Sequence, residues 1–215
     1  MSRRLDVLLD AHGAALAECR RCGHEGDVRP IVSPARAPKV MLIGQAPGKV
    51  ESAGGRPFAG RAGRTLFRWL ERIALDEATA RQHIYIAAVT RCYPGPAPSG
   101  RGDRVPSPRE RELCGTWLDD ELRIIQPRVI VPVGRLAIDR FLGGEQLDQL
   151  IGRAHDVKHA GGQSLAIPLP HPSGASSWIH QPGHQAKLDA ALRLLERELT
   201  TLRIIPSSAP RRSVA

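Results

Sequence analysis

The sequence of 215 residues lacks any long hydrophobic run. Its apolar stretches fall well short of the roughly 20 residues that a membrane-spanning helix needs. The opening residues, MSRRLDVLLDAHG, contain neither an apolar signal region nor a cleavage site. We therefore expect a soluble, cytoplasmic protein with no membrane partner. Nothing along the chain is typical of a second domain of similar size, so the sequence predicts one domain over residues 1–202 and a flexible tail at 203–215.

The common nucleotide-binding fingerprints are also missing. The glycine-rich loop 44–63 fits neither GxGxxG nor GxxxxGK[ST], so it is not predicted to cradle a dinucleotide or a triphosphate. Residues 40–43, directly before it, form an apolar run typical of a strand buried on both faces of a parallel sheet. Ligands of such sheets bind beyond the carboxyl ends of the strands, so this loop is the leading candidate for the functional site. Its notable side chains are Gln45, Glu51 and Phe58.

Cysteine is scarce, and its spacing is informative. The chain has four cysteines: a C-x-x-C pair followed by two distant residues, namely Cys19, Cys22, Cys92 and Cys114. A cytoplasmic chain seldom uses its cysteines for disulfides, so a site of four thiolates is the better interpretation. Zn²⁺ and iron–sulfur clusters both accept four sulfurs. Zinc sites usually contain two short C-x-x-C pairs, and this chain has only one, so the pattern favours a [4Fe–4S] cluster over zinc. Four unrelated buried thiols are the remaining alternative.

Basic residues outnumber acidic ones. The 31 Lys and Arg against 22 Asp and Glu give a net charge of +9, which favours a polyanionic partner, although an arginine-rich genome produces the same excess. Several arginines lie in loop 44–63 and in the proline- and glycine-rich segment 93–108. The predicted nucleic-acid contacts among them are Arg56, Arg61, Arg101 and Arg104.

Strands and helices alternate along the chain, which predicts an α/β fold: a three-layer α/β/α sandwich around a small, about four-stranded parallel twisted sheet. The predicted strands cover residues 40–43, 84–89, 129–133 and 165–168. The predicted helices cover residues 3–18, 62–74, 108–125, 135–142 and 184–202. The loops after strands 40–43 and 165–168 both lie at carboxyl ends, and adjacency of these two strands would bring His171 near Gln45, Glu51 and Phe58.

The motifs at these strand ends resemble the uracil-DNA glycosylase superfamily, and within it the iron–sulfur branch called family 4. GQAPG at 44–48 with Glu51 and GRPFAGRAG at 55–63 resemble its first motif, and HPS at 171–173 resembles its second. The four cysteines fall where the family's cluster ligands fall. The resemblance covers roughly residues 15 to 200. It implies a monomeric repair enzyme that flips uracil, and other deaminated bases, out of DNA and hydrolyses the N-glycosidic bond.

The resemblance also implies roles for individual residues. Phe58 would stack on the flipped base, and His171 would donate a hydrogen bond to the base carbonyl that gathers charge. Glu51 would help to hold or polarise the attacking water. Each residue also has a purely structural interpretation. Phe58 could pack in the core, the ring of His171 could hydrogen-bond only within its loop, and Glu51 could be a member of an ion pair.

Further positions follow from the same resemblance. Base-binding positions besides Phe58 would be Gln45, Ala46 and Ala88. The residues that press into the minor groove would be Pro172, Ser173 and Gly174.

The sequence departs from the family at several of these positions. Gln45 stands where family 4 usually has glutamate, and Ala46 where the main uracil enzymes carry a water-activating aspartate. Ala88 stands where the family has the asparagine that reads the base edge, so the base range should be broader. The segment after HPS is longer than usual and places Trp178 and His180 where an arginine is expected.

The sequence leaves three further functions open. A protein that traps uracil-DNA without turnover would carry a reactive histidine in an inserted basic loop, and residues 93–113 contain no histidine. A zinc-type nucleic-acid module would bind without catalysis. A thymine or hypoxanthine mismatch enzyme would act on a different base.

Overall fold

The computed structural model describes residues 2–24, 28–100, 102–173 and 178–206. Its centre is a five-stranded sheet with the strand order β2-β1-β3-β5-β4. The first four strands in that order are parallel, and β4 pairs with β5 in the antiparallel sense. The strands are β1 (Val40–Gly44), β2 (Ile84–Ala88), β3 (Val129–Pro132), β4 (His155–His159) and β5 (Gly162–Ala166).

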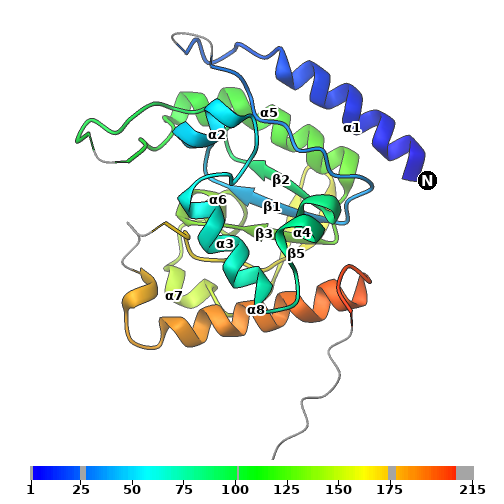
Figure 1. Cartoon of the computed structure of the whole chain (residues 1–215), viewed down its shortest axis with the longest axis vertical. Coiled ribbons are helices and arrows are strands. Elements are labelled where there is room, and N and C mark those ends of the chain that lie inside the picture. The colour runs from blue at the N-terminus through cyan, green and yellow to red at the C-terminus, as the bar shows by residue number, and fades with distance from the viewer. Residues whose placement is uncertain (1, 25–27, 101, 174–177, 207–215) are drawn as a thin grey trace, which may run out of the picture.

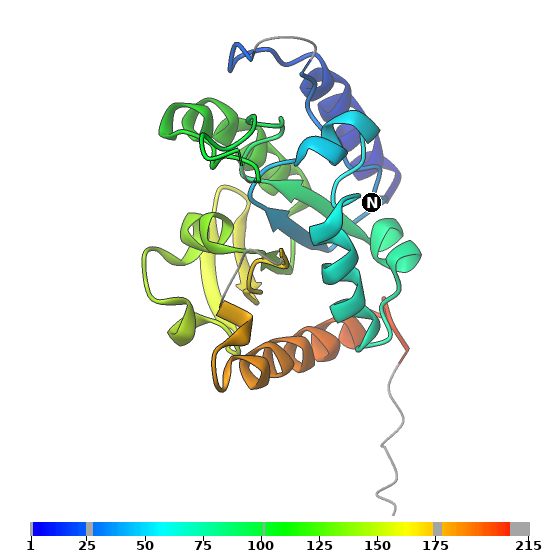
Figure 2. The same cartoon turned by 60° about the vertical axis from the view of Figure 1, so that its left-hand side comes forward.

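Helices cover both faces of this sheet, as Figures 1 and 2 show. They are α1 (Ser2–Ala17), α2 (Lys49–Gly54), α3 (Arg61–Glu71), α4 (Glu77–His83), α5 (Pro108–Ile125), α6 (Arg135–Leu142), α7 (Leu147–Leu150) and α8 (His184–Thr201), with a 3-10 helix η1 (Trp178–His180). Helix α5 begins with a capping box in which Ser107 and Glu110 satisfy each other's backbone N–H groups, and Pro108 occupies its first turn.

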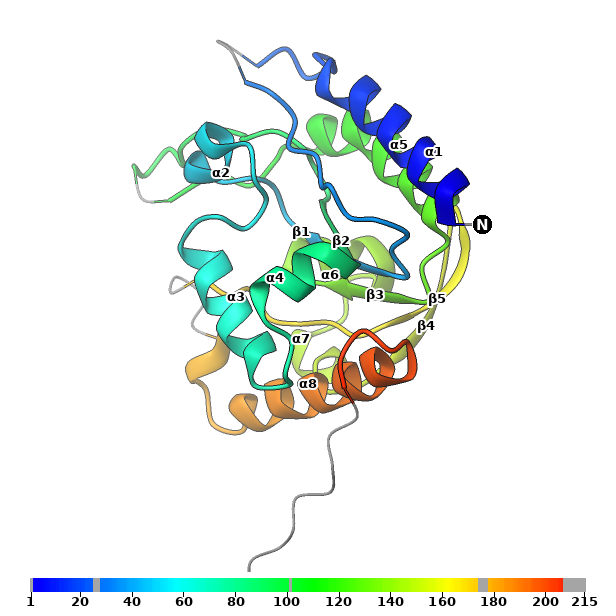
Figure 3. The ribbon, with the colours of Figure 1, turned by 45° about the vertical axis from the view of Figure 1, so that its right-hand side comes forward.

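The alternation of side chains along the central strand creates the two apolar layers. Val40 and Leu42 of β1 belong to a buried cluster that includes side chains of α3 and α8. Met41 and Ile43 point to the opposite face, where the cluster includes side chains of α5. Figure 3 shows α1 and α5 side by side on one face of the sheet and α8 on the other. The predicted three-layer α/β/α sandwich is therefore confirmed.

Some details differ from the prediction. Strands β1 and β5, which were expected to be adjacent, are separated by β3. The sheet has a fifth strand, β4, in which Val157 alone is buried, so it lacks the apolar run that marks the central strands. The short helices α2, α4 and α7 were also not predicted. Ile205 is buried, so the packed chain extends beyond the predicted domain end at residue 202. Residues 207–215 of the predicted tail lie outside the described residues. No described helix is long and apolar enough to span a membrane.

The functional loops gather at one edge of the sheet. The arrowheads of β1 and β2 in Figure 1 point toward the side on which α2 and residues 93–100 and 102–107 lie. The chain after β5 reaches the same edge, because Leu169 continues the sheet through a bridge to Val133 of the segment after β3. His171 follows two residues later. The fold thus brings loop 44–63 and the HPS segment together, as a parallel sheet requires.

Candidate functional site

A cavity of about 500 Å³ opens at this edge of the sheet. Its walls come from loop 44–63, the end of β2, Pro94, residues 102–104 and the HPS segment. Most of the predicted site residues line it, namely Gln45, Ala46, Glu51, Phe58, Ala88, His171, Ser173, Arg61 and Arg104. Residues that are up to about 130 positions apart in the sequence therefore line the same cavity.

Phe58 lines the cavity in an unusual backbone conformation, and two glycines leave the space that it occupies. Its φ is +52°, in the left-handed region that non-glycine residues seldom adopt. A Cβ on Gly44 would lie 3.0 Å from Phe58 Cζ, and a Cβ on Gly63 would lie only 1.7 Å from the Phe58 carbonyl oxygen. The ring and the backbone of Phe58 thus occupy space that any side chain at these two positions would take.

Arg81 of α4 holds the same segment through hydrogen bonds to two of its backbone carbonyls. Its Nη1 donates to the Pro57 carbonyl at 2.9 Å, and its Nη2 to the Phe58 carbonyl at 3.4 Å. Its Nε donates to Glu77 at 2.8 Å, and its guanidinium lies 4.7 Å from the centre of the Phe67 ring. Arg81 was not predicted as a site residue; its spacing of four residues from Glu77 on a helix was the available signal.

Glu51 joins the two ends of the glycine loop. Its Oε2 accepts the Gly48 N–H at 3.1 Å, and its Oε1 accepts the Gly60 N–H at 3.0 Å. These glycines are the N-cap residues of α2 and α3. A Cβ on Gly48 would lie 2.6 Å from Glu51 Oε2, so glycine allows the close approach. The buried carboxylate therefore has a structural partner at each oxygen while it lines the cavity.

The ring of His171 has a defined tautomer. The backbone N–H of Ser173 donates to its Nδ1 at 3.2 Å, and Ser173 Oγ lies 2.8 Å from the same atom. Since a backbone N–H can only donate, Nδ1 is the acceptor and the proton of the neutral ring resides on Nε2. Burial lowers the pKa of His171, which favours this neutral form. The ring packs on Gly134, where a Cβ would lie 2.8 Å from His171 Cδ2.

Ala88 and Gln45 complete the wall of the cavity. Ala88 ends β2 beside Gly44, with which it is paired in the sheet, and it offers only a methyl group to the cavity. The carbonyl of Gln45 accepts the N–H of Thr90 at 3.2 Å, which continues the pairing of the two strands beyond their ends. The position expected to hold a polar base reader is therefore apolar.

The predicted DNA-binding residues differ in their surroundings. Arg56 pairs with Glu77 at 3.1 Å, and both Nη atoms of Arg104 bind Glu110, at 2.7 and 2.6 Å. Hydrogen bonding to Arg104 lowers the pKa of Glu110 to about 2. Exposed Arg61, at the start of α3, has no ion pair among the described residues.

The remaining predicted contacts lie in and around the HPS segment. Pro172 is buried, whereas Arg101 and Gly174 fall outside the described residues. Trp178 is buried and stacks on His184 with 4.0 Å between ring centres, and its Nε1 donates to Asp148 at 3.0 Å. Trp178 therefore anchors the far end of this segment to α7 and α8.

The four cysteines line a second, smaller cavity of about 70 Å³. Cys19 and Cys22 follow α1, Cys92 follows β2, and Cys114 lies in α5. Burial and then the neighbouring thiols raise the pKa of Cys92 to about 12, and burial raises that of Cys114 to about 11. In the part of the chain that the structure describes, no group of three or more Cys, His, Asp or Glu could hold a metal ion. The four cysteines nevertheless line one cavity.

The sequence profile of the uracil DNA glycosylase superfamily matches residues 30–206. This span includes both motifs of the large cavity and two of the four cysteines. The chain belongs to this superfamily.

Individual relatives point to one branch of it. The chain is 33% identical over 135 residues to a type-4 uracil-DNA glycosylase of Thermotoga maritima. The matched region covers 63% of this chain and 65% of that protein, so the chain spans just under two thirds of the length of this relative. It is 32% identical over 166 residues to the type-4 uracil-DNA glycosylase of Archaeoglobus fulgidus, over 74% of this chain and 78% of that protein. A type-5 uracil-DNA glycosylase of Pyrobaculum aerophilum is 28% identical over 151 residues. The type-4 relatives confirm the predicted family 4-like branch.

Proposed function

We propose that the protein is a uracil-DNA glycosylase that initiates base excision repair. The observation that carries this proposal is the convergence of Phe58 and a neutral His171 in one cavity of a uracil DNA glycosylase superfamily fold. Enzymes that act on a base in DNA must take it out of the stack, and a chamber at the strand ends can receive it. The test is the release of free uracil from DNA by the purified protein.

In this proposal the two aromatic groups have separate tasks. The flipped base stacks on Phe58, a contact worth about 1–3 kcal/mol that hardly distinguishes one base from another. As the bond between the base nitrogen and C1′ of the sugar breaks, its electron pair moves onto the base. His171 Nε2–H donates to the base carbonyl on which this charge collects. Water then adds to the sugar carbon and releases a proton to solvent, and the base anion takes up a proton to become the free base.

Glu51 acts mainly on the loop in this account. Its carboxylate accepts hydrogen bonds from the N–H groups of Gly48 and Gly60, and so ties together the two ends of the segment that carries Phe58. Holding the attacking water remains a predicted second task, since the carboxylate also lines the cavity.

The pH dependence follows from the state of His171. The pKa of His171 is lowered by burial, so the neutral ring that can accept from Ser173 and donate through Nε2 persists below the ordinary histidine pKa of about 6.5. We expect a single-turnover rate that is flat from pH 8 to about 6.5 and falls only in more acidic solution. An acidic limb at or above pH 7 would contradict this state of the ring.

The base range should be wider than uracil. The methyl group of Ala88 makes no hydrogen bond to the base edge. A base with a different edge therefore leaves no polar group of the protein unpaired at this position, and the protein has no penalty there against binding it. We propose that hypoxanthine and xanthine are also released. Oligonucleotides with each base at the same position give the comparison, with an Ala88→Asn variant as the matched control that should narrow the range.

We propose that Cys19, Cys22, Cys92 and Cys114 hold a [4Fe–4S] cluster. Four thiols around one cavity, from three separate segments, support a group that accepts four sulfurs, and zinc remains the alternative. When bound, the cluster would fasten α1 and α5 to the end of β2. Iron and sulfide should be found in the purified protein, and Cys92→Ala should lose both together with solubility. Zinc alone, or a soluble variant with unchanged metal, would refute the assignment.

Arg61 should contribute to DNA affinity through phosphate contact. Because it has no ion pair among the described residues and lines the mouth of the cavity, its charge is available to DNA. Arg61→Gln should weaken binding and reduce the slope of log K against log salt by about 1. The matched control is Arg123→Gln on α5, which breaks a pair with Asp120. Equal slopes for wild type and Arg61→Gln would exclude the contact.

A protein that binds or traps uracil-DNA without turnover is the alternative function. It predicts stable complexes and no free base, so the same base-release experiment separates the two. Cytoplasmic location and a monomeric state stay predictions.

A further inference from the structure

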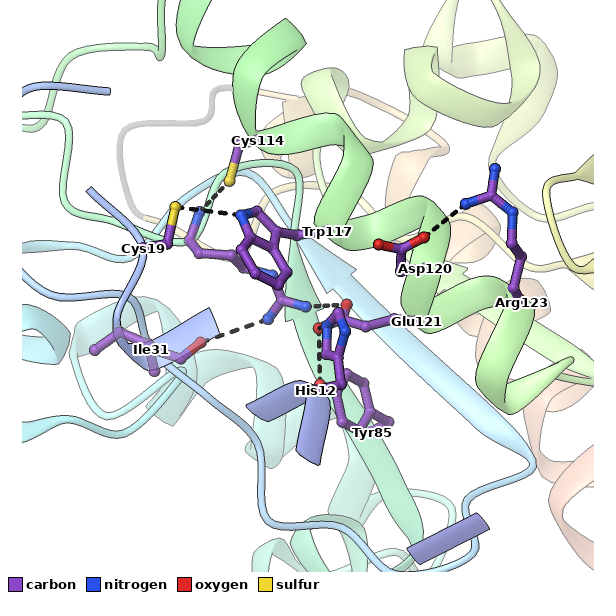
Figure 4. Close-up of polar contacts among 10 residues, drawn as sticks. His12, Cys19, Ile31, Tyr85, Cys114, Trp117, Asp120, Glu121 and Arg123 are labelled. Atoms are coloured by element: carbon purple, nitrogen blue, oxygen red, sulfur yellow. Dashed lines mark hydrogen bonds and ion pairs between the residues drawn. The ribbon is translucent and has the colours of Figure 1, made fainter. Parts of the chain in front are cut away.

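Two N–H groups point at sulfurs of the cysteine site (Figure 4). Trp117 Nε1 lies 3.2 Å from Cys19 Sγ, and the backbone N of Arg91 lies 3.3 Å from Cys114 Sγ. Trp117 follows Cys114 on α5 by three residues, so one helix supplies both a sulfur and the donor to another sulfur. The indole N–H can only donate a hydrogen bond. Trp117 is therefore the donor and Cys19 Sγ the acceptor in this hydrogen bond.

The indole ring is held in this orientation from two sides. The guanidinium of Arg21 lies 4.7 Å from the centre of the Trp117 ring, and Arg21 Nη1 is anchored by Thr116 Oγ1 at 2.8 Å. His12 of α1 meets the ring edge-on, with 5.3 Å between ring centres and 72° between planes. The Nε1–H consequently has little freedom to turn away from the sulfur.

A buried charged network supports His12. The carboxylate of Glu121, which is fully buried, pairs with Arg91 and accepts the Tyr85 hydroxyl at 2.8 Å. His12 Nε2 lies 3.3 Å from the same carboxylate (Figure 4). Removing one partner would leave a buried charge uncompensated, so this network resists rearrangement. It also links the two donors, since Arg91 carries the N–H that faces Cys114.

We propose that Trp117 tunes the metal group held by the four cysteines: its N–H raises the reduction potential of the [4Fe–4S] cluster and slows cluster loss. This inference rests on the proposed cluster. A hydrogen bond to a thiolate withdraws electron density from the sulfur, and the reduced cluster, with one more negative charge, gains more from it than the oxidised one. Trp117 is thus a positioning and tuning residue that need not touch DNA.

The test compares two tryptophan variants after anaerobic loading of the full chain. Trp117→Phe keeps an aromatic ring for Arg21 and His12 but removes the N–H. Trp69→Phe, on α3 against the other apolar layer, is the matched control. The midpoint potential on an electrode should fall for Trp117→Phe and stay unchanged for Trp69→Phe. Bleaching of the cluster absorbance in air should be several-fold faster for Trp117→Phe alone.

The outcomes separate this inference from the proposal beneath it. Loaded Trp117→Phe with the wild-type potential and bleaching rate would overturn the inference while the cluster stands. Protein without iron would overturn the cluster and the inference together. If Trp117→Phe does not load, wild-type protein labelled with ¹⁵N only in its tryptophan indoles decides: an isotropic hyperfine coupling between the reduced cluster and an indole nitrogen supports donation to Cys19 Sγ, and its absence overturns the inference.

Discussion

Replacing His171 by alanine should lower the single-turnover rate of uracil release by about 10²–10³, the usual scale for removing one donor to a developing anion. The reason is the geometry of the ring. Ser173 occupies Nδ1, so Nε2 carries the only donor that His171 can offer to the base. The rate should be measured with enzyme in excess over a duplex that contains one uracil, so that product release does not limit it.

Ser173→Ala is the matched control for that experiment. It removes the hydroxyl but keeps the backbone N–H that fixes the tautomer, so its rate should fall far less than that of His171→Ala. A His171→Ala variant that retains the wild-type rate would exclude the role of this ring. A backbone donor, or His180, would then have to stabilise the leaving base.

Gly63→Ala should be nearly as damaging, although residue 63 has no side chain to lose. Its Cβ would lie 1.7 Å from the carbonyl oxygen of Phe58, so the segment that carries the ring must move. Misplacement by about 1 Å can cost about 10²-fold in rate, and crowding of this kind costs about 1–3 kcal/mol of stability. Single-turnover rates and thermal unfolding measure the two effects separately.

Gly54→Ala, in the same loop, is the control for this substitution. A Cβ there meets no atom within 4 Å, so rate and stability should remain close to wild type. A Gly63→Ala variant with wild-type activity would show that the placement of Phe58 tolerates displacement, and the stacking role would lose its geometric support.

The sequence predicted the arrangement of the cavity because periodicity and strand ends are local properties. The apolar run before Gly44 and the HPS segment after β5 determined that Phe58 and His171 would meet. The three-layer architecture followed from the same alternation. The resemblance to the superfamily, which rested on spaced motifs, was confirmed by the match over residues 30–206.

What the sequence could not predict depends on side-chain contacts that recur at no regular spacing along the chain. The carbonyl contacts of Arg81, the double use of Glu51 and the pairing of Arg104 with Glu110 leave no periodic signal. Strand β4 was missed because only Val157 on it is buried. The donor on Trp117 was missed for a related reason, since its partner Cys19 is 98 residues away.

The most direct measurement is the appearance of free base from a duplex with a single uracil, followed by chromatography of the base and by alkaline cleavage of the strand. The central claim predicts free uracil in amounts equal to the abasic sites formed, with Phe58→Ala slower than wild type. Tight binding of the uracil duplex without release of any free base would contradict the account, and the protein would then be a binding protein of this superfamily.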